Sequence, residues 1–307
     1  IIFEEMAKIM WNAPDLSGKV AVVTGASRGV GRGIASVLGE CGATVYVAAR
    51  SSGASAASDG ASGTIEETAA VVSARGGRGV AVCCDCSKFD DVTALFDRVK
   101  KGRKGLDILV NNAWGGYEGY KDGLPFTNFW KSPVEQMWKG MFESGLRAQM
   151  LCAHRAAPLL IKRPGGLVVG TVAWDGDVYL GGLYDVAKQA TVRFLYGLAR
   201  ELRKYETAAV AVAPGFTRTG RVLDAFHVDE EGAHGIPPLA VSESPEYVGR
   251  AVASLAADPK RMDKSGKTFF SGQLAKEYKF TDIDGRKVPP FRLKHSFDEL
   301  LEGPPEA

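Results

Sequence analysis

The chain has 307 residues, a formal net charge of +2 and 45% hydrophobic residues. A charge this close to neutral, with no basic run that carries interleaved aromatic residues, gives no indication of a nucleic-acid partner or of binding to an acidic membrane surface. No apolar run approaches the ~20 residues of a transmembrane helix. Five cysteines are an odd number in a chain too long for a small secreted fold, which favours a reduced, cytoplasmic setting.

Short apolar runs alternate with helical patterns between residues 19 and 216. This alternation is typical of one doubly wound α/β domain with a parallel sheet between helices. We therefore expect seven strands, at 19–24, 43–49, 78–84, 106–111, 166–171, 208–213 and 267–271.

The first expected strand leads into a glycine-rich turn. Gly25, Gly29 and Gly31 follow the apolar run 19–23, and a helical pattern begins directly after them. Glycines let the backbone approach a pyrophosphate, and a helix N-terminus offers free N–H groups and the positive end of a dipole. Strand, glycine turn and helix together predict a dinucleotide site. The alternative is a tight turn that binds nothing.

Arginines rather than carboxylates stand where the adenosine ribose would bind. The second strand ends at Arg50 with no acidic residue, and Arg28 lies in the glycine turn. A carboxylate there would disfavour a 2′-phosphate, whereas a guanidinium binds phosphate through two hydrogen bonds. We therefore predict NADP(H), with NAD(H) as the less favoured cofactor; the alternative is two solvated surface arginines.

The third strand ends in a run of cysteines. Cys83, Cys84 and Cys86 could suggest a metal site, and Cys84 and Cys86 share one face of a strand. No second pair of ligands follows at a suitable spacing. Small buried apolar residues are the better interpretation, and we expect no metal.

Two later strands also end in informative residues. Asn111, Asn112 and Ala113 follow the run 106–110, and Pro214 and Gly215 follow the run 208–213. Taken singly, an Asn at a strand end can merely satisfy backbone groups, and Pro-Gly is an ordinary turn.

Tyr184 and Lys188 lie four residues apart in a helical segment, and so share one helical face. An ammonium group near a phenol would lower the pKa of the phenol from about 10 towards neutrality. That is what a general acid and base for a carbonyl/alcohol couple needs. Alone the pair is weak evidence, because this spacing recurs on solvated helix faces.

In their order and spacing, these motifs resemble the short-chain dehydrogenase/reductase family over residues 17–272, and the later stretches resemble one branch of it more closely. The resemblance implies a Rossmann-type, NADP-binding domain in which Tyr184 donates and accepts the proton and Lys188 binds the nicotinamide ribose. It further implies that Asp85 contacts the adenine amine. The expected cofactor-binding residues are Gly25, Ser27, Arg28, Gly29, Val30, Gly31, Arg50, Asp85, Cys86, Asn112, Ala113, Tyr184, Lys188, Pro214, Gly215, Thr217 and Thr219.

Two positions differ from the family pattern. Thr171 stands where the family has its catalytic serine; it keeps the hydroxyl that can bind the substrate oxygen, although Thr at a strand end is also ordinary. Gly145 stands where the family has an Asn that helps to hold a water-linked proton path. Gly145 has no side chain to hold that path, so we expect the change to affect the proton path but not the hydride chemistry.

Four segments frame the expected domain. Residues 1–16 form an N-terminal extension and 273–307 a C-terminal extension of the same domain, with a turn at 282–285. An insert at 114–138, carrying Tyr117, Tyr120, Phe126, Phe129 and Trp130, is either a wall of an apolar substrate pocket or a self-packed surface loop. The family resemblance implies a substrate lid at 218–244, for which the sequence favours a loop with at most one short helix.

The sequence thus predicts a reductase of ketones or aldehydes, reversible with alcohols, in which Thr171, Tyr184 and Lys188 are catalytic. The aromatic insert favours a bulky or apolar carbonyl or alcohol as the substrate, and the family resemblance implies a homodimer or homotetramer. Two alternatives stay open: an NAD-dependent alcohol dehydrogenase, and a dinucleotide-binding sensor or scaffold without catalysis.

Overall fold

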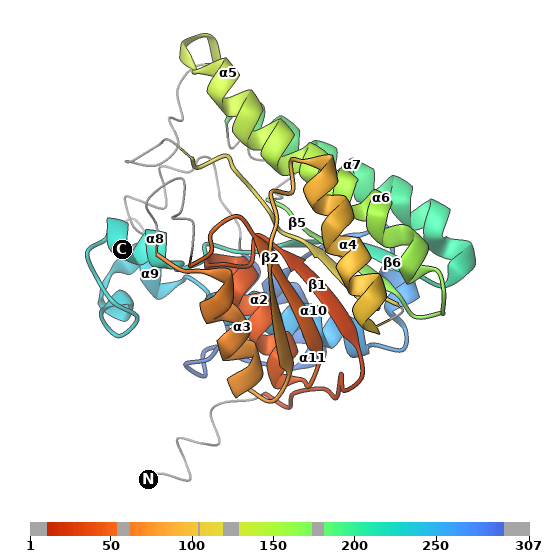
Figure 1. The fold of residues 1–307 in the computed structure, drawn as a ribbon. Coiled ribbons are helices and arrows are strands. Elements are labelled where there is room, and N and C mark those ends of the chain that lie inside the picture. Colours follow the sequence, from red (N-terminus) through yellow and green to blue (C-terminus); the bar gives the residue numbers. More distant parts are fainter. Residues whose placement is uncertain (1–10, 54–61, 104, 119–128, 174–180, 292–307) are drawn as a thin grey trace.

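Seven parallel strands form one sheet in the order β3-β2-β1-β4-β5-β6-β7 (Figure 1). The computed structural model describes residues 11–53, 62–103, 105–118, 129–173 and 181–291. All seven expected strands are confirmed, with ends that differ by at most two residues. They are β1 (Val20–Thr24), β2 (Thr44–Ala49), β3 (Arg78–Cys83), β4 (Ile108–Asn111), β5 (Leu167–Thr171), β6 (Ala208–Ala213) and β7 (Thr268–Phe270).

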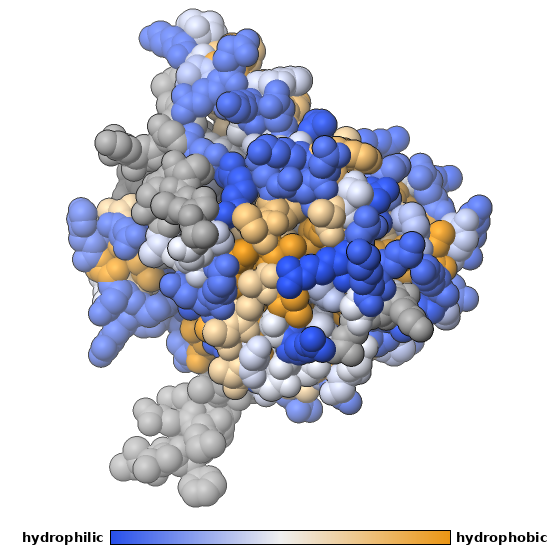
Figure 2. Space-filling model, viewed as in Figure 1, coloured by the Kyte–Doolittle hydropathy of each residue, from blue (hydrophilic) through white to orange (hydrophobic). Residues whose placement is uncertain are grey.

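Helices cover both faces of the sheet, which explains why its central strands are continuous apolar runs. The strands β1, β2, β4, β5 and β6 are buried at every position. At the edge, β3 is partly exposed, and Figure 2 shows apolar side chains among hydrophilic ones on the face where this strand lies.

The helices divide into two layers. One core cluster packs α2, α3, α10 and α11 on one face, and a second packs α4, α6 and α7 on the other. Glycines bring α2 and α10 close together, because a Cβ at Gly33 would stand 2.3 Å from the backbone of Pro245. The α-helices are α2 (Gly29–Glu40), α3 (Ile65–Ala74), α4 (Phe89–Arg103), α5 (Val134–Met137), α6 (Ala148–Leu160), α7 (Gly182–Leu202), α8 (Gly220–Ala225), α9 (Pro237–Ala240), α10 (Pro245–Ala257) and α11 (Ser271–Tyr278).

Strand order reverses between β1 and β4, which are neighbours in the sheet although β2 and β3 separate them in the chain. In open α/β sheets ligands bind at the carboxyl ends of the strands where the order reverses. The glycine turn that follows β1 and the Asn-Asn-Ala segment that follows β4 therefore meet at this point.

The segment 218–244 is more helical than the sequence suggested. It contains α8, a 3-10 turn at Gly232–Gly235 and α9, so the expectation of at most one short helix is wrong. Pro237 at the start of α9 fixes a helical φ there without losing a needed hydrogen bond, since N-terminal N–H groups have no partner within a helix.

Parts of both extensions pack on the domain. Phe280 and Val288 are buried in the core around α10, and the ring of Trp11 meets that of Phe280 edge-on at 5.8 Å. None of the helices in the described ranges has the length and apolar character needed to span a membrane.

Candidate active site

The glycine turn fits tightly against the segment that follows β4. Gly25 has φ +64°, and a Cβ there would stand 2.8 Å from the Cα of Ala113; a Cβ at Gly31 would stand 2.3 Å from the carbonyl oxygen of Gly25. Asn112 fastens the same contact, since its side-chain amide donates to the carbonyl oxygens of Thr24 and Gly25, both at 3.1 Å. Only glycine allows this approach.

The N-terminus of α2 suits an anion. The helix begins at Gly29, which has φ +52°; among the described residues no side chain caps it, and its first turn contains no acidic residue. Uncapped N–H groups at a helix start can donate hydrogen bonds to a pyrophosphate. Val30 is partly buried beside them, and Ser27 is buried, with its carbonyl oxygen accepting from the Thr68 hydroxyl. The turn therefore fits a dinucleotide.

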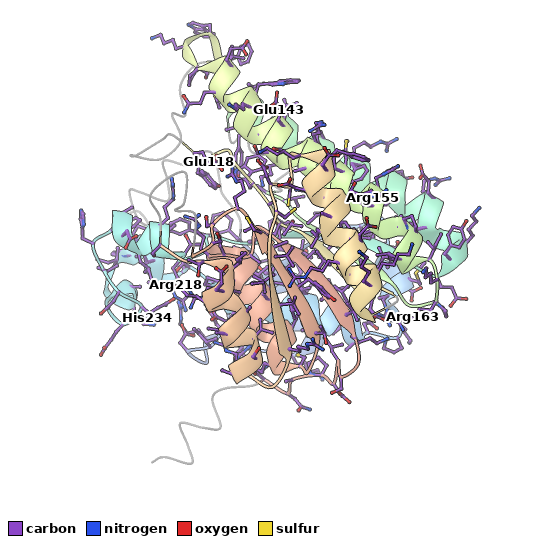
Figure 3. The ribbon with its side chains drawn as sticks, viewed as in Figure 1. Glu118, Glu143, Arg155, Arg163, Arg218 and His234 are labelled. Atoms are coloured by element: carbon purple, nitrogen blue, oxygen red, sulfur yellow. The ribbon has the colours of Figure 1, made fainter. Side chains whose placement is uncertain are left out.

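Two arginines lie beside this turn, as the sequence suggested. Arg28 Nη2 donates to Ser51 Oγ at 2.7 Å, and Arg50 forms an ion pair with Glu118. Figure 3 shows Glu118 at the carboxyl ends of the strands, whereas Arg163, which pairs with Asp107, lies at their opposite ends. A phosphate bound by Arg50 would thus compete with the Glu118 carboxylate.

Asp85 and Cys86 lie at the end of β3, beside Arg50. Asp85 contributes to the raised pKa of the Arg50 guanidinium, although burial opposes that rise and Glu118 is the stronger partner. The Asp85 carboxylate also accepts from the backbone N–H and hydroxyl of Ser87, as an Asp that starts a turn does. Cys86 is buried, with its sulfur 4.0 Å from that of Cys84.

The Pro214-Gly215 turn continues towards the same helix start. Thr219 lies against the glycine turn, because a Cβ at Gly29 would stand 3.4 Å from the Thr219 Cγ2. Thr217 is buried and its hydroxyl donates to the carbonyl oxygen of Gly215. Residues far apart in sequence therefore border one site.

Thr171 stands at the end of β5 and is connected to this site. It is buried, and its Oγ1 lies 3.3 Å from Oδ1 of Asn112 and donates to it. This hydroxyl can rotate to donate to a ligand oxygen instead, because a threonine hydroxyl has one freely turning proton.

Tyr184 and Lys188 lie in the first two turns of α7 next to aromatic rings, where Lys188 is buried and Tyr184 is partly buried. The ring of Trp114 lies under the Lys188 ammonium, 3.6 Å from Nζ to ring centroid, and meets the ring of Tyr184 edge-on at 5.6 Å. Burial lowers the pKa of Lys188 to about 7. Within the described residues no carboxylate forms an ion pair with this lysine.

The expected lowering of the Tyr184 pKa is wrong for this structure. Burial raises the pKa of the Tyr184 phenol well above its usual value, and the neighbouring Tyr117, hydrogen-bonded to it, raises it further. Lys188 does not offset this, since its Nζ is 5.7 Å from the Tyr184 ring centroid. Tyr184 is consequently held as a neutral phenol, the form that donates a proton.

Gly145 lies in a widened stretch of helix, a π-helix at Trp138–Arg147 between α5 and α6. The indole of Trp114 fills the space beside it, since a Cβ at Gly145 would stand 2.7 Å from the ring. The described part of the insert therefore contributes Trp114 and Tyr117 to the site, while Phe129 and Trp130 are exposed. Tyr120 and Phe126 lie outside the described residues.

Several residues at this site were not singled out from the sequence. Ser51, Glu118 and Thr24 have side chains that partner Arg28, Arg50 and Asn112. Trp114 was read only as the start of the aromatic insert. Its position directly after Asn111-Asn112-Ala113 was the available signal, because β4 ends where the strand order reverses and ligands bind at that point.

Known proteins resemble this chain over most of its length. The family model described as short chain dehydrogenase matches residues 19–227. Dehydrogenase/reductase SDR family member 1 of Mus musculus is 36% identical over 285 residues, 90% of this chain and 87% of that protein. 3-Oxoacyl-[acyl-carrier-protein] reductase of Synechocystis sp. is 28% identical, over 83% of this chain and 95% of that protein.

A solved structure shares the fold. L-Sorbose reductase from Gluconobacter frateurii, solved with NADPH and L-sorbose, superimposes with a TM-score of 0.69 at 24% identity, over 84% of this chain and 97% of that chain. The mouse relative represents the branch that the sequence resembled.

Proposed function

Since the chain belongs to the short-chain dehydrogenase/reductase family, we propose that it is an NADP(H)-dependent oxidoreductase that reduces a ketone or aldehyde and reverses the reaction with an alcohol. The observation that carries this proposal is the position of Tyr184 and Lys188 against Trp114, which lies two residues beyond the Asn112 that bonds the glycine turn. A phenol kept protonated is a general acid, which carbonyl reduction requires.

Each polar side chain then has a definite task. The hydroxyls of Thr171 and Tyr184 bind and orient the carbonyl oxygen, and Tyr184 transfers its proton to that oxygen as the alcohol forms. Lys188 lies one helical turn further along and stabilises the negative charge that develops on the phenol oxygen. When bound, NADPH supplies the hydride.

The preference for NADP(H) rests on Arg28, Arg50 and Ser51. Arg50 and Ser51 follow the carboxyl end of β2, Arg28 reaches them from the glycine turn, and no carboxylate ends that strand. A 2′-phosphate gains charge-assisted hydrogen bonds from such groups. Trp114 and Tyr117 favour a bulky or apolar carbonyl, because aromatic rings present large apolar surfaces to a ligand.

Fluorescence titration with NADPH and NADH tests the cofactor. We expect the wild type to bind NADPH at least tenfold more tightly than NADH, and Arg50→Asp to invert this order, because a carboxylate repels the phosphate and accepts from a free ribose. Arg98→Asp, the same charge change at an exposed position of α4, is the control and should leave the ratio unchanged. Equal affinities in the wild type would contradict the NADP(H) assignment.

A further inference from the structure

Trp114 contacts both members of the Tyr-Lys pair. Its ring centroid lies 3.6 Å from the Lys188 Nζ, closer than the Tyr184 ring at 5.7 Å. The planes of Trp114 and Tyr184 are nearly perpendicular, at 86°. The indole thus faces the ammonium group and meets the edge or face of the phenol at right angles.

Glycines on two sides hold this indole in place. A Cβ at Gly116 would stand 2.6 Å from the ring, and one at Gly145 would stand 2.7 Å from it. Both distances are shorter than carbon atoms tolerate, so any side chain at either position would displace the ring. Among the described residues the buried Nε1 of Trp114 has no hydrogen-bond partner, and its orientation is therefore set by packing.

The backbone beside Trp114 is also seated on the widened helix. A Cβ at Gly140 would stand 2.5 Å from the carbonyl oxygen of Gly115, and a Cβ at Gly115 would stand 2.7 Å from the Cβ of Ser144. The loop at Gly115 and the π-helix therefore pack closely against each other, with no room for a side chain at Gly115 or Gly140. Short π-helical stretches often mark functional sites.

An indole face is the strongest aromatic partner for a cation, and the interaction grows when the cation is shielded from water. Lys188 is 8% exposed, and the described residues offer it no carboxylate. We propose that Trp114 is a positioning residue for Lys188: its indole, seated in the space that Gly145 leaves, binds the ammonium group by a cation–π contact and holds it beside Tyr184. Trp114 thereby favours the charged form of Lys188, against the effect of burial.

The Lys188 pKa measures this contact directly and requires no turnover. With ¹³C- and ¹⁵N-labelled lysine, and the Lys188 signal assigned by its loss in Lys188→Met, we expect Trp114→Leu to weaken proton binding about tenfold, a fall of about one pKa unit. Trp114→Phe keeps an aromatic face and should lose less. Gly145→Ala, which adds one methyl group against the ring, should move the pKa in the same direction.

Trp11→Leu is the matched control. Trp11 also lies under a cation, Arg250, at 5.1 Å, and contacts Phe280 in the core cluster around α10. Its loss should leave the Lys188 pKa unchanged. An unchanged Lys188 pKa in folded Trp114→Leu, or an equal fall in Trp11→Leu, would overturn the proposal.

The catalytic consequence rests on the proposed function. In carbonyl reduction, Trp114→Leu should lower kcat/KM about 10- to 30-fold, move the basic limb of the pH profile down by about one unit, and be largely rescued by Trp114→Phe. If the wild type turned over no carbonyl, the proposed function would fail while the pKa comparison would still decide the role of Trp114. A loss of rate with an unmoved pH profile would contradict positioning.

Discussion

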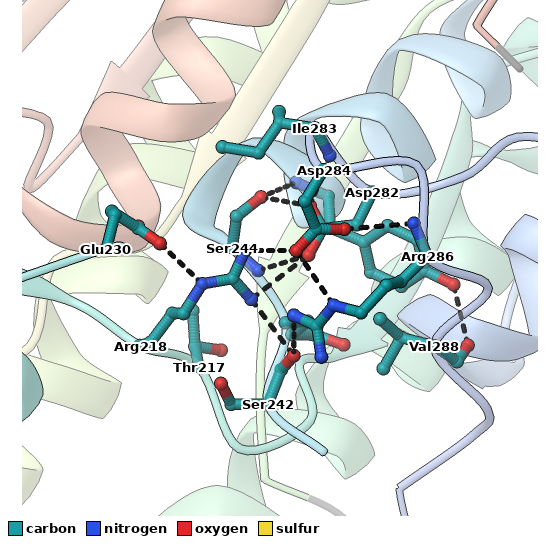
Figure 4. A network of polar contacts seen from close by, with 12 residues as sticks. Thr217, Arg218, Glu230, Ser242, Ser244, Asp282, Ile283, Asp284, Arg286 and Val288 are labelled. Atoms are coloured by element: carbon teal, nitrogen blue, oxygen red, sulfur yellow. Dashed lines mark hydrogen bonds and ion pairs between the residues drawn. The ribbon is translucent and has the colours of Figure 1, made fainter. Parts of the chain in front are cut away.

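Lys188 and Arg218 are both buried cations, but their surroundings differ. Lys188 lies against the faces of aromatic rings. Arg218 is 1% exposed and reaches three carboxylates, with Nε 2.6 Å from Glu230, Nη1 3.2 Å from Asp282 and Nη2 3.0 Å from Asp284 (Figure 4). Counter-ions thus surround one cation, whereas polarisable but neutral rings surround the other.

The pKa values follow from that contrast. Burial alone would lower the pKa of Arg218, but Asp282, Glu230 and Asp284 raise it above its usual value. For Lys188 burial acts unopposed by any carboxylate, and its pKa falls to about 7. A cation with counter-ions serves structure, because its charge is fixed; a cation without them can respond to a charge that forms beside it.

The Arg218 network has a clear structural task. It joins the segment after the Pro214-Gly215 turn to the turn at 282–285, where Ser244 donates to Asp282. Arg286 supports the network by donating to Asp284 at 2.8 Å. The chain beyond α11 therefore fixes the base of the segment that carries α8 and α9.

The largest effects on activity and on stability should come from replacing Lys188 and Arg218, respectively. Lys188→Met is expected to lower kcat by about 10²- to 10³-fold, the loss typical of removing one group that stabilises a developing charge, while the free energy of unfolding stays the same or rises because an unpaired buried charge is lost. Carbonyl turnover and urea denaturation measure the two quantities. A variant that kept wild-type kcat would remove Lys188 from the mechanism.

Arg218→Met should show the reverse. Removing the cation leaves buried carboxylates unpaired, which costs about 3–5 kcal/mol of unfolding free energy. Urea denaturation measures the loss, and Arg218→Lys, which restores one charge but not the forked geometry, should recover only part of it. An unchanged free energy of unfolding in Arg218→Met would show that the network does not stabilise the fold.

Glu243 provides an acidic counterpart to Lys188. It is buried next to Gly215, accepts from the Ser271 hydroxyl at 2.6 Å, and burial raises its pKa from 4.5 to about 8. The folded state therefore binds more protons than the unfolded state between these values, and stability falls as pH rises through this window.

Glu243→Gln removes that pH dependence. As the pH rises from 5 to 9, the unfolding free energy of this variant minus that of the wild type should increase by about a few kcal/mol. Urea denaturation at both pH values is the measurement. A constant difference between the two proteins would mean that Glu243 is ionised throughout.

The smallest effect is expected at Glu230, the outermost partner of Arg218, whose side chain is 48% exposed. Glu230→Gln should cost no more than about 1 kcal/mol, because water screens an exposed carboxylate. Asp282→Asn, at the fully buried partner, is the informative comparison and should cost more. Equal losses of unfolding free energy in the two variants would show that burial does not decide how much each carboxylate contributes to stability.

The sheet could be predicted because its strands are local apolar runs. The glycine turn, the Asn-Asn-Ala segment, the Tyr-Lys pair and the Pro-Gly turn each mark a strand end or a helix start. The contacts of Trp114 could not, because Lys188 lies far away in the sequence and only packing joins them. The same packing reversed the expected pKa shift of Tyr184. From the sequence alone, Arg218 is only the first residue of the expected lid. Its partners Asp282 and Asp284 lie in the turn at 282–285, and no sequence pattern links that turn to the arginine.

NADPH consumption with a panel of aromatic ketones, quinones and steroid ketones, for the wild type and for Tyr184→Phe, tests the account most directly. We predict that the wild type reduces at least one class, and that Tyr184→Phe binds NADPH equally well but turns over more slowly by at least 10²-fold, because it lacks the proton to donate. Turnover that survives in Tyr184→Phe would contradict the assignment of the acid. NADPH binding by the wild type without turnover of any member would favour a cofactor-binding sensor instead.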